Sequence, residues 1–144
     1  MSRKVFVTHG HDHSARNEVA LFLHEVGLTP IIMENQANEG RTLIEKFEKD
    51  SDAAYAIIIM SPDDLGRAKN SGDEKLQPRA RQNVVFELGF FFGKSTRKRV
   101  AVLNTDAELE RPTNIEGIAW ILLDAHGGWK HMLTRELKAV GLVD

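Results

Sequence analysis

The feature that most limits the fold of this chain is an unbroken apolar run near its middle. The run reads Tyr55-Ala56-Ile57-Ile58-Ile59-Met60 and is followed at once by Ser61 and Pro62. A strand with one face in water alternates apolar and polar side chains, whereas this run has no polar position. It is therefore typical of a central strand in a parallel sheet, buried on both of its faces.

Four more segments read as strands, and segments with helical spacing separate them. The predicted strands run from Lys4 to Thr8, from Leu28 to Met33, from Arg99 to Leu103 and from Ile118 to Leu123. Helices are predicted after Asp12 or Ser14, from Thr42 onward, between Arg79 and Lys94, and from Trp129 to Val140, with long polar loops at 61–78 and 105–114. Strands that alternate with helices predict a parallel sheet with right-handed crossovers. We expect an α/β fold with a flavodoxin-like five-stranded parallel sheet and helices on both faces.

Length and charge limit the organisation and the partners of the chain. Its 144 residues carry a net charge of −2 and include no cysteine. We expect residues 1–144 to form a single domain, either a whole small protein or one module of a longer one. The slightly negative net charge does not favour binding to nucleic acid, and no apolar run is long enough to span a membrane. The absence of disulfides, of thiolate sites and of a signal-peptide pattern fits a cytoplasmic protein.

Polar residues gather where the first and third predicted strands end. His9, Gly10 and His11 follow the first strand directly, and Ser61 follows the third. Ligands of open α/β sheets bind at this edge, where the strands have their carboxyl ends. An H-x-H pair can bind zinc, but hydrogen bonding to a phosphate or ribose suits this edge better, so we expect a nucleotide site and no metal. Two aspartates just beyond Ser61 could serve acid–base work or bind magnesium, or they could cap the next turn.

A single glutamate, Glu87, lies within the most apolar helical segment. At helical spacing it shares a face with Val84, Phe90 and Phe91. A carboxylate on such a face loses water, and its charged form then needs a partner or a ligand. The plainer alternative is a boundary glutamate that reaches solvent or pairs with Arg81 or a lysine. The phenylalanines are predicted to be core residues rather than a platform for stacking bases.

Four motifs follow one another along the chain. They are Val5-Phe6-Val7-Thr8-His9-Gly10-His11-Asp12, Asn38-Glu39-Gly40-Arg41-Thr42, Ile57-Ile58-Ile59-Met60-Ser61-Pro62 and Arg79-Ala80-Arg81-Gln82-Asn83-Val84-Val85-Phe86-Glu87-Leu88-Gly89. Together they resemble the TIR-like family, especially the bacterial predicted nucleotide-binding TIR-like group, whose BB loop matches the polar loop from Glu34 to Arg41. The last motif resembles the helix that carries the glutamate of NAD-cleaving members. Many animal and plant TIR domains have an aromatic residue four positions before that glutamate, where this chain has Asn83.

The resemblance implies an NAD⁺ glycohydrolase that breaks the bond between nicotinamide and ribose, with Glu87 as the catalytic residue. It implies substrate-binding roles for His9, Gly10, His11, Glu39, Arg41, Ser61 and Asn83. NAD⁺ would then be a substrate and not a cofactor, and the product either ADP-ribose or a cyclic isomer. The resemblance also implies antiphage signalling, self-association through the loop from Glu34 to Arg41, and a fused or associated cyclic-nucleotide sensor domain of the STING or SAVED type. Two alternatives stay open, a TIR module that only assembles and a nucleoside-transferase-like or nucleotide-binding protein.

The chemistry of the reaction agrees with a carboxylate at this place. Nicotinamide leaves from a cationic ring and its departure produces an oxocarbenium-like ribose. A carboxylate beside the ribose stabilises the developing positive charge, and more strongly where little water screens it. The sequence leaves open whether Glu87 acts as a nucleophile or only as an electrostatic partner.

Overall fold

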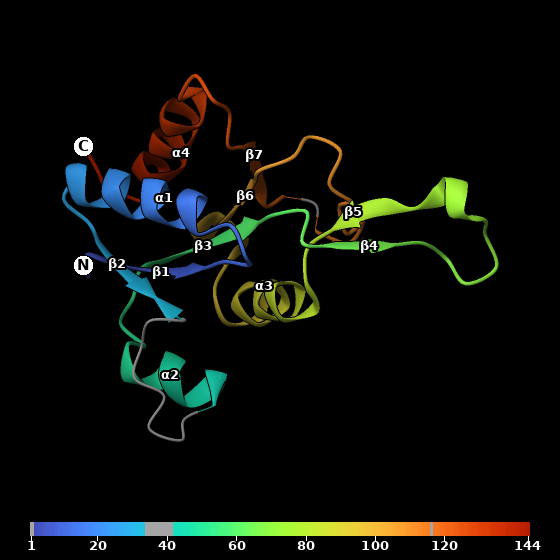
Figure 1. Ribbon diagram of the computed structural model, residues 1–144. Helices are drawn as coiled ribbons and strands as arrows, with labels where there is room; N and C mark the ends of the chain where they lie inside the picture. The colour runs from blue at the N-terminus through green and yellow to red at the C-terminus, as the bar shows by residue number, and fades with distance from the viewer. Residues whose placement is uncertain (1, 34–41, 116) are drawn as a thin grey trace.

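A five-stranded parallel sheet forms the centre of the computed structural model, which describes residues 2–33, 42–115 and 117–144 (Figure 1). Its strands are β1 Lys4–Thr8, β2 Thr29–Ile32, β3 Tyr55–Met60, β6 Val100–Asn104 and β7 Ala119–Leu122. They lie in the order β2-β1-β3-β6-β7, and all neighbours are parallel. The expected flavodoxin-like order is confirmed, and every residue of the central strand β3 is buried.

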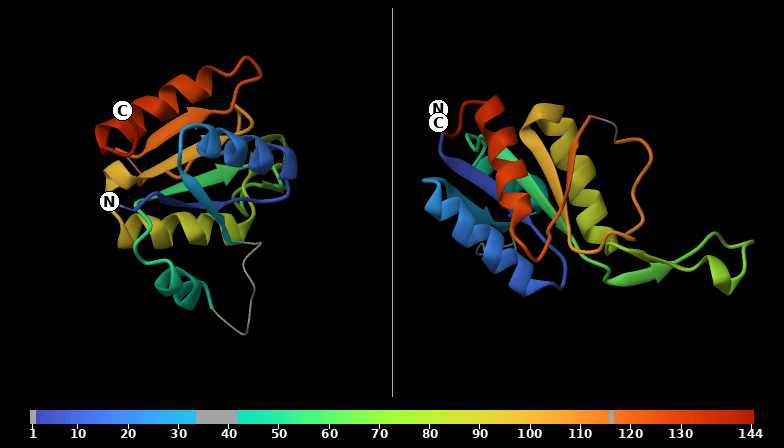
Figure 2. Two further views of the ribbon diagram at one scale, coloured as in Figure 1. Left: turned by 90° about the vertical axis from the view of Figure 1, so that its left-hand side faces the viewer. Right: turned by 90° about the horizontal axis from the view of Figure 1, so that it is seen from above.

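Helices cover both faces of the sheet, as expected (Figures 1 and 2). The α-helices of the described residues are α1 His13–Glu25, α2 Leu43–Lys49, α3 Gln82–Lys94 and α4 Gly128–Ala139. Alternate residues of β1 face opposite layers: Val5 and Val7 join the cluster that contains Trp129 of α4, whereas Phe6 joins the cluster that contains Phe91 of α3. None of these helices has both the length and the apolar character needed to cross a bilayer.

Side-chain caps account for where two of the helices begin. The Asp12 carboxylate accepts the Ala15 N–H at 2.9 Å, so Asp12 and not Ser14 caps α1. The Thr42 hydroxyl accepts the Glu45 N–H at 3.3 Å at the start of α2. Helix α3 differs, because the residue at its cap position, Arg81, makes no side-chain cap hydrogen bond. The first N–H groups of a helix have no intrahelical partner, so the start of α3 presents donors.

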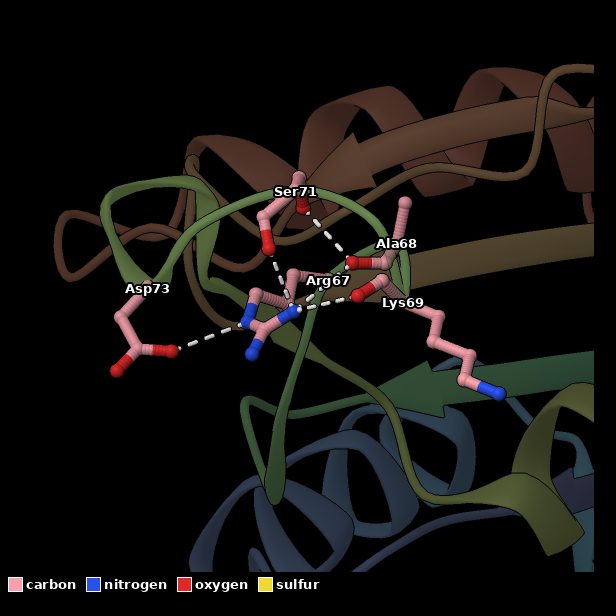
Figure 3. A network of polar contacts seen from close by, with 5 residues as sticks. All are labelled: Arg67, Ala68, Lys69, Ser71 and Asp73. Carbon is pink, nitrogen blue, oxygen red and sulfur yellow. Dashed lines mark hydrogen bonds and ion pairs between the residues drawn. The ribbon is translucent and has the colours of Figure 1, made fainter.

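The segment predicted as one long loop at 61–78 is in part regular structure, which corrects that prediction. Strand β4 Asp64–Gly66 pairs antiparallel with β5 Gln77–Arg79, and a turn of 3-10 helix, Asp73–Lys75, lies between them. The two-stranded ribbon formed by β4 and β5 projects away from the five-stranded sheet (Figures 1 and 2). Near its tip, the Arg67 guanidinium donates to the carbonyl oxygens of Ala68, Lys69 and Ser71 and pairs with Asp73 (Figure 3). Each of these strands has only three residues, too few to show the alternating pattern that reveals longer strands.

The carboxylate of Asp124 caps α4 and makes the stability of the fold depend on pH. It accepts the N–H groups of Gly128 at 3.0 Å and Trp129 at 2.8 Å. These bonds hold the pKa of Asp124 below its ordinary value of 3.8. A carboxyl whose pKa is lowered by folding stabilises the fold above its unfolded pKa, and this contribution disappears as pH falls through the folded pKa.

Asp124→Ala is therefore expected to lower the thermal midpoint near neutral pH, because two helix N–H groups lose their acceptor. The variant and the parent should converge as the pH falls below the ordinary aspartate value. Thermal melts followed by circular dichroism across this range provide the measurement. Equal midpoints near neutral pH would contradict the capping role.

Candidate active site

A cavity of about 360 Å³ opens at the carboxyl edge of the sheet and brings together four parts of the chain. Its lining residues are Thr8, His9, Met33, Lys46, Arg81, Asn83, Phe86 and Glu87. They come from the end of β1, the residue after β2, helix α2, and the beginning of α3. A second hollow of about 650 Å³ shares Phe86 but contains none of the residues predicted for the site. The smaller cavity is the candidate site because Glu87, Asn83 and His9, which were predicted for the site, line it together.

Glu87 and Asn83 lie one helical turn apart on α3 and line the same cavity. Residues four apart in a helix are neighbours on one face, so the carboxylate and the amide are presented together. Val84 and Phe91, which were predicted to share the face of Glu87, are buried, while Glu87 itself is half-buried. The carboxylate therefore lies at the boundary between the apolar core and the cavity, where water screens its charge less than at an open surface.

His9 comes from a different part of the chain, directly after β1, and is also buried. Its Nδ1 atom lies 2.7 Å from the carbonyl oxygen of Gly10. A carbonyl can only accept a hydrogen bond, so Nδ1 donates, and in the neutral ring Nε2 is the acceptor nitrogen. The preceding residue, Thr8, has a buried hydroxyl with no hydrogen-bond partner among the described residues. Buried polar atoms are nearly always paired, so the Thr8 hydroxyl is available to a ligand or water in the cavity.

Gly10, His11 and Ser61 lie beside the cavity and are joined by Asp63. The Asp63 carboxylate accepts the His11 N–H at 3.1 Å and the Ser61 hydroxyl at 2.6 Å. A Cβ atom at Gly10 would clash with Asp63 Oδ2, so only glycine leaves room for this arrangement. Asp63 thus ties the end of β1 to the end of β3. Within the described ranges, no group of three or more His, Asp or Glu side chains is placed to hold a metal ion.

The sequence-predicted residues divide into three groups. Glu87, His9 and Asn83 line the cavity, whereas Gly10, His11 and Ser61 are next to it in the Asp63 network. The remaining two, Glu39 and Arg41, lie outside the described residues, as does the whole loop at 34–41. The cavity has five more lining residues that were not among those predicted for the site, namely Thr8, Met33, Lys46, Arg81 and Phe86. Position in the chain could have identified two of them, because Thr8 ends a strand and Arg81 immediately precedes a helix at this edge of the sheet. No local feature of the sequence distinguishes Lys46 from other surface lysines.

Residues 4–125 match the family model described as CAP12/Pycsar effector protein, TIR domain. The chain belongs to this family. It is 46% identical over 143 residues to the uncharacterized protein YuaY of Escherichia coli K12, covering 99% of this chain and 47% of YuaY. It is 30% identical over 104 residues to the Pycsar effector protein BcPycTIR of Burkholderia cepacia, covering 71% of this chain and 33% of that protein. The TIR domain therefore spans less than half of the length of each of these two relatives.

Solved structures support the fold of this TIR domain. A point mutant of a flavo di-iron protein from Thermotoga maritima superposes with a TM-score of 0.57 at 13% sequence identity. The match covers 97% of this chain and 36% of the other. At that identity the likeness shows a shared flavodoxin-like architecture and carries no information about the reaction.

Proposed function

We propose that this TIR domain is an NAD⁺ glycohydrolase that breaks the bond between nicotinamide and ribose. The observation that supports the proposal is the convergence of Glu87, Asn83 and His9 on one cavity at the carboxyl edge of the sheet. The three residues come from two separate segments, and all three were expected in the site from the sequence. NAD⁺ is the substrate in this proposal, and the reaction needs no metal ion.

The proposed reaction depends on the carboxylate of Glu87. As nicotinamide departs, positive charge develops on the ribose, and a fixed carboxylate at its edge stabilises that charge more than it stabilises the bound substrate. The half-buried position of Glu87 makes this stabilisation larger than at an open surface. Asn83 and His9 supply hydrogen-bonding groups that can orient the ribose hydroxyls or the carboxamide. Glu87 acts either as an electrostatic partner or as a nucleophile that forms a ribosyl ester, which water then hydrolyses.

Release of nicotinamide tests the proposal directly. The purified chain is incubated with NAD⁺, and nicotinamide and ADP-ribose or its cyclic isomer are separated by chromatography. Nicotinamide release above the rate without protein is the expected result. If no release occurs even when the chain is assembled by fusion to an oligomerising partner, the chain is instead a TIR module that acts only by assembly.

In the cell we propose that the domain is the effector of an antiphage signalling system and acts on cytoplasmic NAD⁺. The family description and the Pycsar effector from Burkholderia cepacia support this role. A further relative, CD-NTase-associated protein 12 of Sphingobacterium faecium, is 28% identical over 88 residues, which cover 61% of this chain and 26% of that protein. Because the domain covers only part of such relatives, we propose that residues 1–144 act as one module beside a cyclic-nucleotide sensor domain.

Activation by self-association is the third part of the proposal and rests on the TIR resemblance. If the competent form is about one percent of the free chain, a neighbour must contribute roughly 5 kcal/mol of differential contact to make it dominant. Specific activity should therefore rise faster than linearly with protein concentration, and Arg41→Glu should reduce that rise. Nicotinamide release measured over a wide concentration range, with light scattering in parallel, is the test. A verified monomer with high activity that is independent of concentration would contradict this prediction.

Gly10→Ala is expected to raise the KM for NAD⁺ about tenfold, which is about 1.4 kcal/mol and the scale of one net hydrogen bond. Its Cβ would displace the Asp63 carboxylate from the His11 N–H and so move the loop that carries His9. The matched control is Gly93→Ala on α3, where an added Cβ meets no atom within 4 Å. Steady-state kinetics of both variants provide the comparison. An unchanged KM in Gly10→Ala would show that the Asp63 network does not position the site.

A further inference from the structure

We propose that Lys46 and Arg81 form a phosphate-binding pair that holds the pyrophosphate of a dinucleotide while its nicotinamide ribose reaches Glu87. The inference rests on the proposed function for its choice of ligand, but its central observation is independent of catalysis. Two cationic side chains, one from α2 and one from the start of α3, line the same cavity as Glu87. Both are half-buried rather than extended into solvent.

The spacing along α3 suits a ligand of this length. Arg81 precedes Glu87 by six residues, which corresponds to about 9 Å along a helix axis. In a dinucleotide, the ribose ring and its 5′ carbon separate the glycosidic bond from the nearer phosphate. A ligand whose glycosidic bond lies beside Glu87 can therefore extend its phosphates toward the start of the helix. The long arginine side chain covers the remaining distance, and its guanidinium can bind phosphate oxygens in a bidentate manner.

The charges of the cavity complement those of NAD⁺ at both ends. Of the lining residues that the structure describes, Glu87 carries one negative charge, and Lys46 and Arg81 carry two positive charges. The ligand carries one positive charge on the nicotinamide ring and two negative charges on the pyrophosphate. Placing the ring near Glu87 and the phosphates near Lys46 and Arg81 brings opposite charges together, whereas the reverse orientation brings like charges together. Lys46 and Arg81 thus also determine the orientation in which the dinucleotide binds.

Two further observations point to an anion with hydrogen-bond acceptors. Helix α3 begins without a side-chain cap at Arg81, so its first N–H groups and its dipole favour a negative group at that end. The Thr8 hydroxyl lines the cavity, is buried, and has no partner among the described residues. A phosphate or ribose oxygen in the cavity would provide a hydrogen-bond partner for this hydroxyl.

Binding of inorganic pyrophosphate tests the pair without any turnover. Isothermal titration calorimetry at low salt compares the full chain with Arg81→Gln, Lys46→Gln and the control Lys94→Gln, which removes an exposed cation from the other end of α3. We expect both cavity variants to weaken binding at least tenfold, and added salt to weaken binding by the parent. The control should bind like the parent. Thermal melts establish that each variant is folded, and Arg81→Lys should restore part of the affinity because it keeps the charge.

Failure of this inference and failure of the proposed function are distinguishable. No measurable pyrophosphate binding by the parent, or equal affinity in Arg81→Gln and Lys46→Gln and the parent, overturns the phosphate-binding pair whatever the enzyme assay shows. Binding that follows the two cations, with no nicotinamide released even by the chain fused to an oligomerising partner, retains the pair and overturns the glycohydrolase. Where NAD⁺ is cleaved, Arg81→Gln should raise KM more than it lowers kcat, because the phosphates are held equally in the substrate and the transition state. A larger fall in kcat than rise in KM would instead show that Arg81 acts in the chemical step.

Discussion

Glu87→Gln is expected to lower the rate of nicotinamide release from NAD⁺ by about a hundredfold or more, the scale of losing one essential electrostatic group. The substitution keeps the size and shape of the side chain and removes its negative charge. Because the interaction of the charge with the ribose strengthens as the glycosidic bond breaks, kcat should fall by a larger factor than the affinity for substrate. Single-turnover nicotinamide release, measured by chromatography, separates the chemical step from product release.

A matched control variant tests whether the loss of activity depends on where the negative charge is removed. Glu25→Gln makes the same change on an exposed side chain at the end of α1, on the other face of the sheet. It should cleave NAD⁺ at the parental rate. Glu87→Gln should also remain folded, because it keeps the size and shape of a half-buried side chain. Near-parental turnover by Glu87→Gln would remove the catalytic assignment, and a large loss of stability would show that Glu87 supports the fold.

Phe91→Ala is expected to lower the free energy of unfolding by about 3–5 kcal/mol, a large share of the stability of a domain of this size. Phe91 is completely buried. Its ring centroid lies 5.1 Å from that of Phe6 in β1 and 6.0 Å from that of Phe47 in α2. The phenyl ring therefore joins α3 to the sheet and to α2, and its removal leaves a cavity that these elements cannot fill. Urea denaturation followed by circular dichroism measures the loss.

The same helix provides the control for this prediction. Phe86 leaves 66% of its surface exposed, so Phe86→Ala should change stability by less than about 1 kcal/mol. The comparison uses stability alone, since Phe86 also lines the candidate site. Similar losses in the two variants would mean that the apolar face of α3 is not oriented toward the sheet as described.

Much of the fold was predictable because its signals are local. The apolar run of β3 and the short β-branched segments marked the strands, and helical spacing marked the segments between them. The sequence offered Asp12 or Ser14 as the N-terminal cap of α1. The hydrogen bond from the Ala15 N–H to the Asp12 carboxylate selects Asp12. The ribbon of β4 and β5 was missed because its stability comes from cross-strand pairing and the contacts of Arg67, not from a hydrophobic pattern.

The site was predictable only in part, because some of its residues have local signals in the sequence and others are recognised only by their contacts. Glu87 stood out because a charged residue in an apolar helical segment is conspicuous in the sequence itself, and His9 because it follows a strand at the ligand edge of the sheet. Asp63 could be read as a cap or an acid–base group, and only its contacts with His11 and Ser61 show that it joins two strand ends.

The sequence by itself therefore determined the class of fold, the order along the chain of the five sheet strands and the four α-helices, and the helix face that carries Glu87. These properties follow from side-chain periodicity within single segments, which the chain carries whatever its tertiary arrangement. Only the tertiary structure decided that Lys46 and Arg81 line the same cavity as Glu87. Lys46 belongs to α2 and the other two to α3 and its cap, and how these helices meet depends on packing, including that of Phe47 with Phe6 and Phe91. Contacts between distant segments leave no periodic trace in either one, so they become visible only when the chain is folded.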